Sequence, residues 1–421
     1  MIATSFRFQR IQGWILVLAA LSVAAVSCSD PAEPGFLKFW SDDTPWRLLG
    51  GMKQNGSWDQ LGRKYTQVRP LQVFQGKLYV GLVNNDHLYG EVWRFDGAEW
   101  ERVAGGGEMG SWNEGQYNAV NSMAADSTYL YAGTGNYLGM ATVWRFDGST
   151  WTQIGGNNLN GSWGSNIDDV WHMTFHQGQL YAGLVEERSG QLAAPLYRYN
   201  GATWSLVTGI NGENGGWNNT QGYFMAYVSL SDGTYLYSGL AGRSDHNGNF
   251  FRYDGSTFEQ IGGQGIRGSW NNPEIKFVGD GIIYHSQLYV SLQGSSDPSG
   301  NRENPVWKFD GTSWSTVGNV PAEWSNFQIF NKLIEYNGKL YLSTGGAPGT
   351  ATIWVLDETL NVWNKVAGHG IEGSSWHLSP GQTGTTGTQW IYKMTIFQGK
   401  LIIGMATSGY PYSAEVWGYP Y

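Results

Sequence analysis

Two histidines, His172 and His176, stand four residues apart in the segment 170–176, directly after the acidic pair Asp168 and Asp169. In a strand, side chains at positions i and i+4 lie on the same face. Two imidazoles on one face are a possible metal site. The related segments described below lack histidine at both positions, which favours an ordinary strand. We therefore predict no metal and no other cofactor.

Tryptophan recurs inside stretches of Asn, Gly and Ser that are typical of loops, such as NNLNGSWGS at residues 157–165. In one interpretation each indole is buried between neighbouring structural units, and its N–H binds a backbone carbonyl. In the other, each ring is exposed and stacks on a sugar. The second interpretation makes seven tryptophans candidate ligand-binding residues. These are Trp58, Trp112, Trp163, Trp217, Trp270, Trp324 and Trp376.

Motifs for covalent or metal catalysis are absent from the sequence. It contains no Gly-x-Ser-x-Gly, no His-Glu-x-x-His and no phosphate-binding loop. No paired carboxylates stand at a recognisable spacing either. We therefore predict no catalytic residues, and binding is favoured over enzymatic activity.

The candidate residues belong to a repeat that runs through most of the chain. One strand ends in Leu-Tyr or a close variant, and the next leads into Asp-Gly or a variant of it. A third strand then opens with an aromatic residue. The first of these strands recurs at 76–82, 128–134, 178–184, 234–240, 286–292, 338–344 and 399–405. The second recurs at 91–97, 142–148, 195–201, 249–255, 305–311, 352–358 and 415–421. The opening aromatic residues are Trp46, Trp100, Trp151, Trp204, Phe258, Trp314 and Trp363.

An apolar strand before each Leu-Tyr strand completes a unit of four strands in about 49–56 residues. The 61 glycines and 15% aromatic residues also favour short strands and tight turns over helices. Repeated four-stranded units predict an all-β protein, a seven-bladed β-propeller at residues 46–421. The chain ends inside the seventh unit, so the N-terminal strand near Trp46 is expected to close the last blade.

The repeat resembles the kelch type of β-propeller, the type that galactose oxidase also contains. LYLSTGG at 340–346 and IWVLDETLNVW at 353–363 follow the kelch spacing best, and the other units are shorter between Asp and Trp. The resemblance covers about residues 46–421. The cofactor of galactose oxidase needs a Tyr–Cys crosslink, and the only cysteine, Cys28, lies outside the repeats, which excludes that chemistry.

Polar residues interrupt the pattern of the first strands at His172, Asp280, Lys332 and Lys393. Ligands of propellers often lie over the central channel, where such residues can face the channel mouth. We regard these four as candidates for binding an anion or a sugar. Solvated channel-lining residues without a ligand are the alternative.

The N-terminus predicts export. Residues 1–27 combine Arg7 and Arg10 with an apolar stretch at 13–26, and they resemble a bacterial lipoprotein signal peptide. The resemblance implies a lipid on Cys28, and residues 28–45 read as a tether. Removal of the two arginines shifts the formal net charge from −9 to −11, and no basic patch points to nucleic acid.

These observations predict a binding module at the bacterial cell envelope, in the periplasm or on the cell surface. It would be a monomer that recognises a glycan or an envelope protein through loops between blades. It would meet a membrane only through the lipid on Cys28. A polymer-acting enzyme with a site at the channel mouth and a scaffold in an envelope complex are the alternatives.

Overall fold

The computed structural model describes most of the chain after residue 44. The described residues are 45–84, 89–136, 139–186, 194–242, 248–294, 305–326, 329–346, 349–368, 370–374, 376, 390–407 and 414–420. The predicted signal peptide, the tether up to residue 44 and Cys28 lie outside this range. Among the described residues, no helix has the length and apolar character needed to span a membrane.

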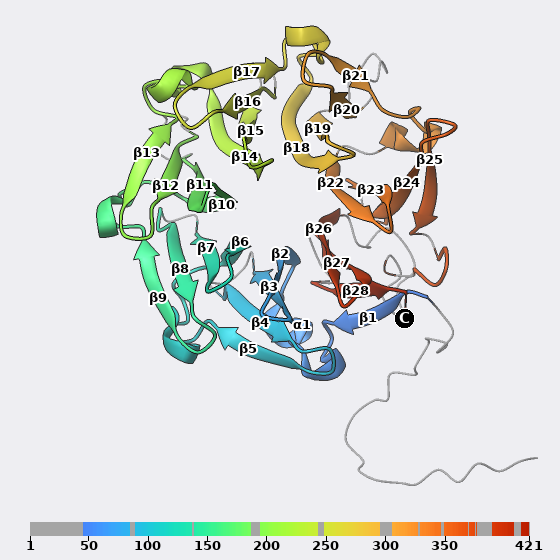
Figure 1. Ribbon diagram of the computed structural model, residues 1–421. Coiled ribbons are helices and arrows are strands. Elements are labelled where there is room, and N and C mark those ends of the chain that lie inside the picture. Colours follow the sequence, from blue (N-terminus) through green and yellow to red (C-terminus); the bar gives the residue numbers. More distant parts are fainter. Residues whose placement is uncertain are drawn as a thin grey trace, which may run out of the picture. The chain divides into compact units, whose positions relative to one another are not determined.

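The regular secondary structure of the described chain is almost entirely β-strand, and the strands fall into groups of four (Figure 1). The first strands are β2 (Gln67–Phe74), β6 (Ala119–Ala125), β10 (Asp169–His176), β14 (Tyr223–Ser231), β18 (Ile275–Tyr284), β22 (Ile329–Tyr336) and β26 (Trp390–Phe397). The second strands are β3 (Lys77–Val83), β7 (Leu130–Gly135), β11 (Gln179–Val185), β15 (Leu236–Gly242), β19 (Gln287–Gly294), β23 (Lys339–Gly345) and β27 (Lys400–Ala406).

The third strands are β4 (Glu91–Phe95), β8 (Thr142–Phe146), β12 (Leu196–Tyr199), β16 (Phe250–Tyr253), β20 (Val306–Phe309), β24 (Thr352–Asp357) and β28 (Val416–Tyr419). The fourth strands are β5 (Trp100–Ala104), β9 (Trp151–Gly155), β13 (Trp204–Thr208), β17 (Phe258–Gly262), β21 (Trp314–Thr316), β25 (Val362–Ala367) and β1 (Arg47–Gly50). We number the groups 1 to 7 in this order, so that group 1 is β2–β5.

Each group is antiparallel, and strand β1 joins the two ends of the chain. It pairs with β28, with Arg47 opposite Gly418 and Leu48 opposite Trp417. Each first strand contacts the first strands of both neighbouring groups, including β2 with β26. These strands are the innermost ones in Figure 1. One residue of each first strand is therefore brought close to the same central axis.

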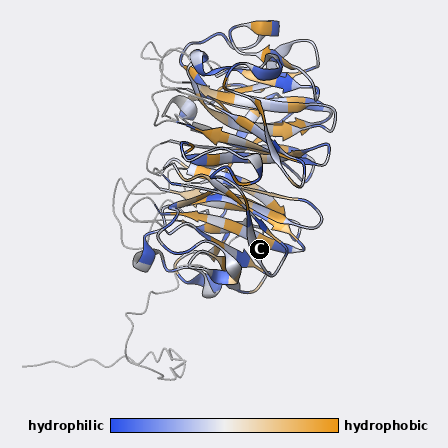
Figure 2. Ribbon diagram, turned by 90° about the vertical axis from the view of Figure 1, so that its left-hand side faces the viewer, coloured by the Kyte–Doolittle hydropathy of each residue, from blue (hydrophilic) through white to orange (hydrophobic). Residues whose placement is uncertain are grey.

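The hydrophobic core lies between neighbouring groups as well as within them. One cluster combines Leu49 and Val416 of group 7 with Val68 and Phe95 of group 1, all at most 4% exposed. In Figure 2 the hydrophobic colouring follows the strands, whereas many turns are hydrophilic. Burial between groups explains why aromatic residues recur at fixed positions of the repeat, because each interface needs the same filling.

The Asp-Gly segments form turns, as their residue types predict. Asp254 accepts hydrogen bonds from the backbone N–H groups of Ser256 and Thr257, both at 2.8 Å, and Gly255 has a φ of 99°. These backbone bonds lower the pKa of Asp254 to about 2. The same bonds recur at Asp96, Asp147 and Asp310.

Helices are short and lie mainly in the connections between groups. The single α-helix of the described chain is α1 (Gln60–Arg63). The 3-10 helices are η1 (Gln54–Gly56), η2 (Glu108–Gly110), η3 (Leu159–Gly161), η4 (Glu213–Gly215), η5 (Asn219–Gln221), η6 (Ile266–Gly268) and η7 (Ala322–Asn326). Most of them directly precede a loop tryptophan.

Candidate functional site

The seven loop tryptophans are buried, so their ring faces are not available to a sugar. Their exposed fractions lie between 0% and 3% for Trp58, Trp112, Trp163, Trp217, Trp270, Trp324 and Trp376. The expectation that these residues bind a ligand through exposed rings is therefore corrected. The physical reason is that each ring fills the space between two neighbouring groups.

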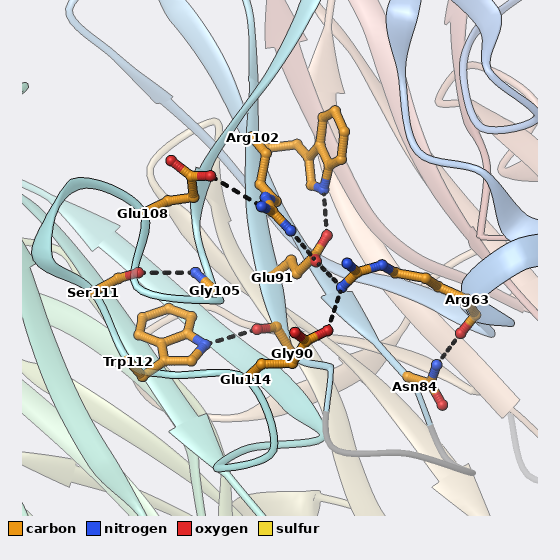
Figure 3. Close-up of polar contacts among 11 residues, drawn as sticks. Arg63, Asn84, Gly90, Glu91, Arg102, Gly105, Glu108, Ser111, Trp112 and Glu114 are labelled. Carbon is orange, nitrogen blue, oxygen red and sulfur yellow. Dashed lines mark hydrogen bonds and ion pairs between the residues drawn. The ribbon is translucent and has the colours of Figure 1, made fainter.

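Trp112 illustrates this packing. Its indole N–H donates to the carbonyl of Gly90 in its own group at 2.7 Å, as Figure 3 shows. Its ring packs against Trp144 and Trp151 of the next group, with centroid distances of 5.6 and 5.9 Å. The equivalent N–H to carbonyl bond, at 2.7–2.9 Å, recurs in Trp58, Trp163, Trp217, Trp270 and Trp376. The loop tryptophan is thus a wedge that links one group to the next.

The residues before the wedge shape its loop. Gly110 has a φ of 76°, a left-handed conformation that favours glycine. Ser111 then accepts a hydrogen bond from the backbone N–H of Gly105 at 2.9 Å (Figure 3). The same serine bond recurs at Ser57, Ser162, Ser269 and Ser374. The Gly-Ser-Trp sequence is therefore explained by the turn and needs no ligand.

The predicted histidine pair does not converge. Four residues of strand extend over about 13 Å, which is too far for two ligands of one metal. His172 lies at a central cavity, whereas Nδ1 of His176 lies 2.8 Å from Oγ of Ser231 in the next group. Among the described residues, no cluster of three or more His, Cys, Asp or Glu could hold a metal ion.

Every first strand carries a β-bulge at the same place in the repeat. The register shifts between Val68 and Leu71 in β2 and at the corresponding place in β6, β10, β14, β18, β22 and β26. The extra residues are Arg69, Asn121, Trp171, Tyr227, Gly279, Asn331 and Tyr392. A bulge re-aims side chains. Consecutive residues such as Trp171 and His172 consequently line the same cavity, which a regular strand would prevent.

This central cavity has a volume of about 60 Å³. It is lined by three cationic side chains, one histidine, three aromatic rings and smaller residues, contributed by six of the first strands. The lining includes Arg69, Asn121, Ser122, Trp171, His172, Tyr227, Lys332, Tyr392 and Lys393. Group 5 contributes none of the lining, and its bulge residue is Gly279.

Three of the four predicted channel residues meet at this cavity, and the fourth supports one of them. His172, Lys332 and Lys393 are lining residues. Asp280 is buried beside the cavity, where Oδ1 lies 3.5 Å from Nζ of Lys332. Its Oδ2 accepts the backbone N–H of Leu333 at 2.9 Å. Asp280 thus neutralises and positions Lys332.

Arg69 was not predicted from the sequence, and it lines the cavity. Its guanidinium carbon lies 4.8 Å from the ring centroid of Trp171 and 5.6 Å from that of Tyr392. Its Nε donates to Gln67 at 2.6 Å, and it also donates to Asn121. In strict strand alternation Arg69 would point away from the residues predicted for the channel. Only the bulge brings it to them.

A further signal in the sequence marks the bulges. In each group the second strand carries a glycine or serine opposite the bulge. These residues are Gly81, Gly133, Gly183, Gly239, Ser291, Ser343 and Gly404. A Cβ atom added at Gly81 would lie 2.7 Å from Val120 of the next group. Small residues at this position therefore permit the close approach of neighbouring groups near the axis.

The titration behaviour of the cavity follows from burial and from like charges. Burial, followed by the positive charges of Lys393 and Lys332, lowers the pKa of His172 well below 6.5. Burial lowers the pKa of Lys393 below 10.5, and Asp280 opposes this shift. His172 is consequently neutral near pH 7, and its buried Nδ1 has no hydrogen-bond partner among the described residues.

A second ionic cluster connects α1 with group 1 and the loop that follows it (Figure 3). The carboxylate of Glu91 forms ion pairs with Arg63 at 2.9 Å and Arg102 at 3.1 Å. These arginines also reach Glu114 and Glu108, at 3.1 and 2.9 Å. The cluster borders a cavity of about 620 Å³. Because each arginine is paired with two glutamates, the cluster has no cation free for a ligand. It links α1 to group 1.

No protein-family model and no curated protein matches this chain. Solved structures are similar to it at low identity. The GH74 xyloglucanase from Xanthomonas campestris matches with a TM-score of 0.52 and 14% identity, over 89% of this chain and 53% of the xyloglucanase. This chain thus spans about half of that protein's length.

A chain of the mitotic checkpoint complex matches with a TM-score of 0.53 and 13% identity, over 95% of this chain and 98% of that one. The β-propeller domain of the trilobed protease from Pyrococcus furiosus matches with a TM-score of 0.46 and 6% identity, over 84% and 95%. At such identities the likeness concerns the fold alone. The described chain is all-β, and the solved structures similar to it include a β-propeller domain.

Proposed function

We propose that the protein binds an anionic ligand, the acidic part of a glycan, in its central cavity and catalyses no reaction. The observation that carries this proposal is the pair of cations Arg69 and Lys393. Both line the cavity, and neither forms an ion pair with a carboxylate among the described residues; Asp280 acts on Lys393 only at longer range. Lys332, in contrast, is already paired with Asp280.

Unpaired charge inside a cavity is costly, and an anion offsets that cost. A buried cation loses hydration unless a counter-charge or hydrogen bonds replace it. Arg69 has neutral hydrogen-bond partners, Gln67 and Asn121. The protein as a whole carries a formal charge of −9, so the positive charge is a local property of the cavity.

We further propose that the protein is a seven-bladed, kelch-like propeller in which groups 1 to 7 are the four-stranded blades. The pairing of β1 with β28 supports closure of the last blade by the N-terminal strand. The recurrence of Leu-Tyr strands, Asp-Gly turns and wedge tryptophans supports the equivalence of the groups. In such a ring the first strands surround the axis, which suits a ligand site there.

The proposed location is the bacterial cell envelope. Residues 1–27 would act as a lipoprotein signal peptide, Cys28 would carry the lipid, and residues 28–45 would tether the propeller. A surface-anchored monomer would then meet acidic glycans of the envelope or of its surroundings. An envelope protein that carries such a glycan is an equivalent partner.

A glycan array with acidic and neutral members tests the proposal. The purified chain is expected to retain acidic glycans and to release neutral ones. Lys393→Met removes the charge and is expected to weaken binding at least about 10-fold. Lys339→Met, at the exposed start of β23, is the matched control. If no acidic glycan binds, or if the two variants behave alike, the proposal is wrong.

A further inference from the structure

His172 offers an unused hydrogen-bonding atom to the ligand of the central cavity. Its Nδ1 is buried and has no partner among the described residues. A buried polar atom without a hydrogen bond destabilises the folded protein. Such atoms are rare in folded proteins and need an explanation. A ligand group that binds Nδ1 supplies one.

The groups around His172 decide what kind of ligand group this is. Lys393 and Lys332 face the imidazole from β26 and β22, and their positive charges oppose its protonation. Arg69 from β2 adds a third cation to the cavity, and Asp280 from β18 pairs with Lys332. An imidazole that stays neutral has one nitrogen that donates and one that accepts. A hydroxyl suits either tautomer, because it can both donate and accept.

The cations thus favour a negatively charged group of the ligand, and the histidine favours a hydroxyl. Both groups must fit in one small cavity. A cavity of about 60 Å³ holds roughly four to six waters or one small ionic group with a neighbouring hydroxyl. The rings of Trp171, Tyr227 and Tyr392 form apolar parts of its wall. Aromatic walls suit the C–H faces of a sugar ring, and the ionic groups suit its charged substituent.

We propose that the ligand presents a single negative charge next to a hydroxyl on a sugar ring, with the charge held by Arg69 and Lys393 and the hydroxyl bound by His172. Uronic acid residues and sulfated sugars both have this chemistry. The inference rests on the proposed function and deepens it by placing a hydroxyl next to the charge and by assigning His172 to bind that hydroxyl.

Titration calorimetry with four probes tests the inference. Oligogalacturonate and a sulfated glucan oligomer carry charge and hydroxyls. The methyl ester of oligogalacturonate lacks the charge, and an oligoacrylate lacks the hydroxyls. We expect at least one of the two acidic sugars to bind, and the ester and the oligoacrylate to bind at least about 10-fold more weakly. Which acidic sugar binds identifies the source of the charge.

Two histidine variants separate hydrogen bonding from packing. His172→Phe keeps a planar ring and is expected to weaken acidic-sugar binding about 10-fold. His172→Gln can donate and accept, and it is expected to stay within about 3-fold of the original protein. Thermal unfolding of both variants verifies that they fold.

The outcomes distinguish the inference from the proposed function. If oligoacrylate binds as tightly as the acidic sugars and His172→Phe changes nothing, the hydroxyl contact is wrong and the anion site stands. If no charged probe binds, the proposed function itself fails. If the methyl ester binds as well as oligogalacturonate, the charge has no role and both are overturned.

Discussion

The wedge tryptophans and the bulge residues are two sets of seven at equivalent repeat positions, and they differ in what is repeated. The wedge position carries the same side chain, an indole, all seven times, and six of these indoles donate their N–H to a carbonyl at 2.7–2.9 Å. The bulge position has the same backbone irregularity each time but different side chains. Its side chains range from Arg69 through Trp171 to Gly279.

This difference separates architecture from binding. An interface that recurs between all groups requires the same filling each time, so the side chain is kept. Side chains that meet at one axis would crowd or repel one another if they were identical. A mixed set instead builds a cavity with cations, rings and a neutral histidine. Where the backbone repeats and the side chains do not, we expect the ligand site.

The largest expected effect is on stability, from Trp270→Ala in the wedge. Trp270 is fully buried, and its N–H donates to the carbonyl of Gly248 at 2.7 Å. Removal of the ring leaves a cavity, and substitutions of this kind cost about 3–5 kcal/mol. Chemical denaturation followed by circular dichroism measures the loss.

Trp171→Ala in the bulge set is the matched comparison. Trp171 is partly exposed and lines the central cavity. We expect it to cost about 1–2 kcal/mol of stability while it abolishes most acidic-glycan binding. If Trp171→Ala destabilised the protein as much as Trp270→Ala, the distinction between the two sets would be lost.

The next effect compares two glutamates at equivalent positions. Glu91 and Glu415 each accept an indole N–H at 2.8 Å, from Trp93 and Trp417. Glu91 also pairs with Arg63 and Arg102, so Glu91→Gln is expected to cost about 1–3 kcal/mol at pH 7.

Glu415 is the opposite case, because burial raises its pKa from 4.5 to about 7. A raised folded-state pKa means that this carboxyl stabilises the protein fully below pH 4.5 and loses that contribution as pH rises through about 7. Glu415→Gln is therefore expected to be nearly neutral at pH 4.5 and stabilising at pH 8, by about 3 kcal/mol. Equal effects of both substitutions at pH 8 would contradict the comparison.

The sequence predicts the regular part of this molecule well and the central cavity only in part. Repeated Asp-Gly turns and Leu-Tyr strands have local causes, so an all-β fold could be read from them. The burial of Trp163 could not, because a loop indole can face a sugar or a neighbouring sheet. Arg69 was missed because it stands one position before the predicted channel residues in the repeat, and only the bulge brings it to the cavity. Lys332 and Lys393 were found because they break the repeat.

A smaller effect is expected from Lys393→Met, and it has opposite signs for binding and stability. The substitution removes a cation whose pKa burial lowers, so the free protein should become slightly more stable, by about 0.5–1 kcal/mol. Acidic-glycan affinity should fall about 10- to 50-fold. Thermal unfolding and calorimetry on the same samples measure both, and a loss in both quantities would mean that Lys393 serves the fold.

The last effect is the pH dependence that His172 gives to folding. Its pKa is lowered well below 6.5 by burial and by the nearby lysines, so the unfolded chain binds a proton more readily than the folded one. The stability linked to His172 is therefore present above pH 6.5 and is lost as pH falls below it. Between pH 7.5 and 5.5 this loss is about 1.4 kcal/mol. Denaturant unfolding at these two pH values should show it in the original protein, and His172→Gln should lack that share of the slope. A negative charge bound beside the imidazole offsets the repulsion by the lysines and favours its protonated form, so a saturating acidic sugar should narrow the stability difference between pH 7.5 and 5.5. An unchanged difference would separate His172 from the ligand and leave it as a buried residue of the cavity wall.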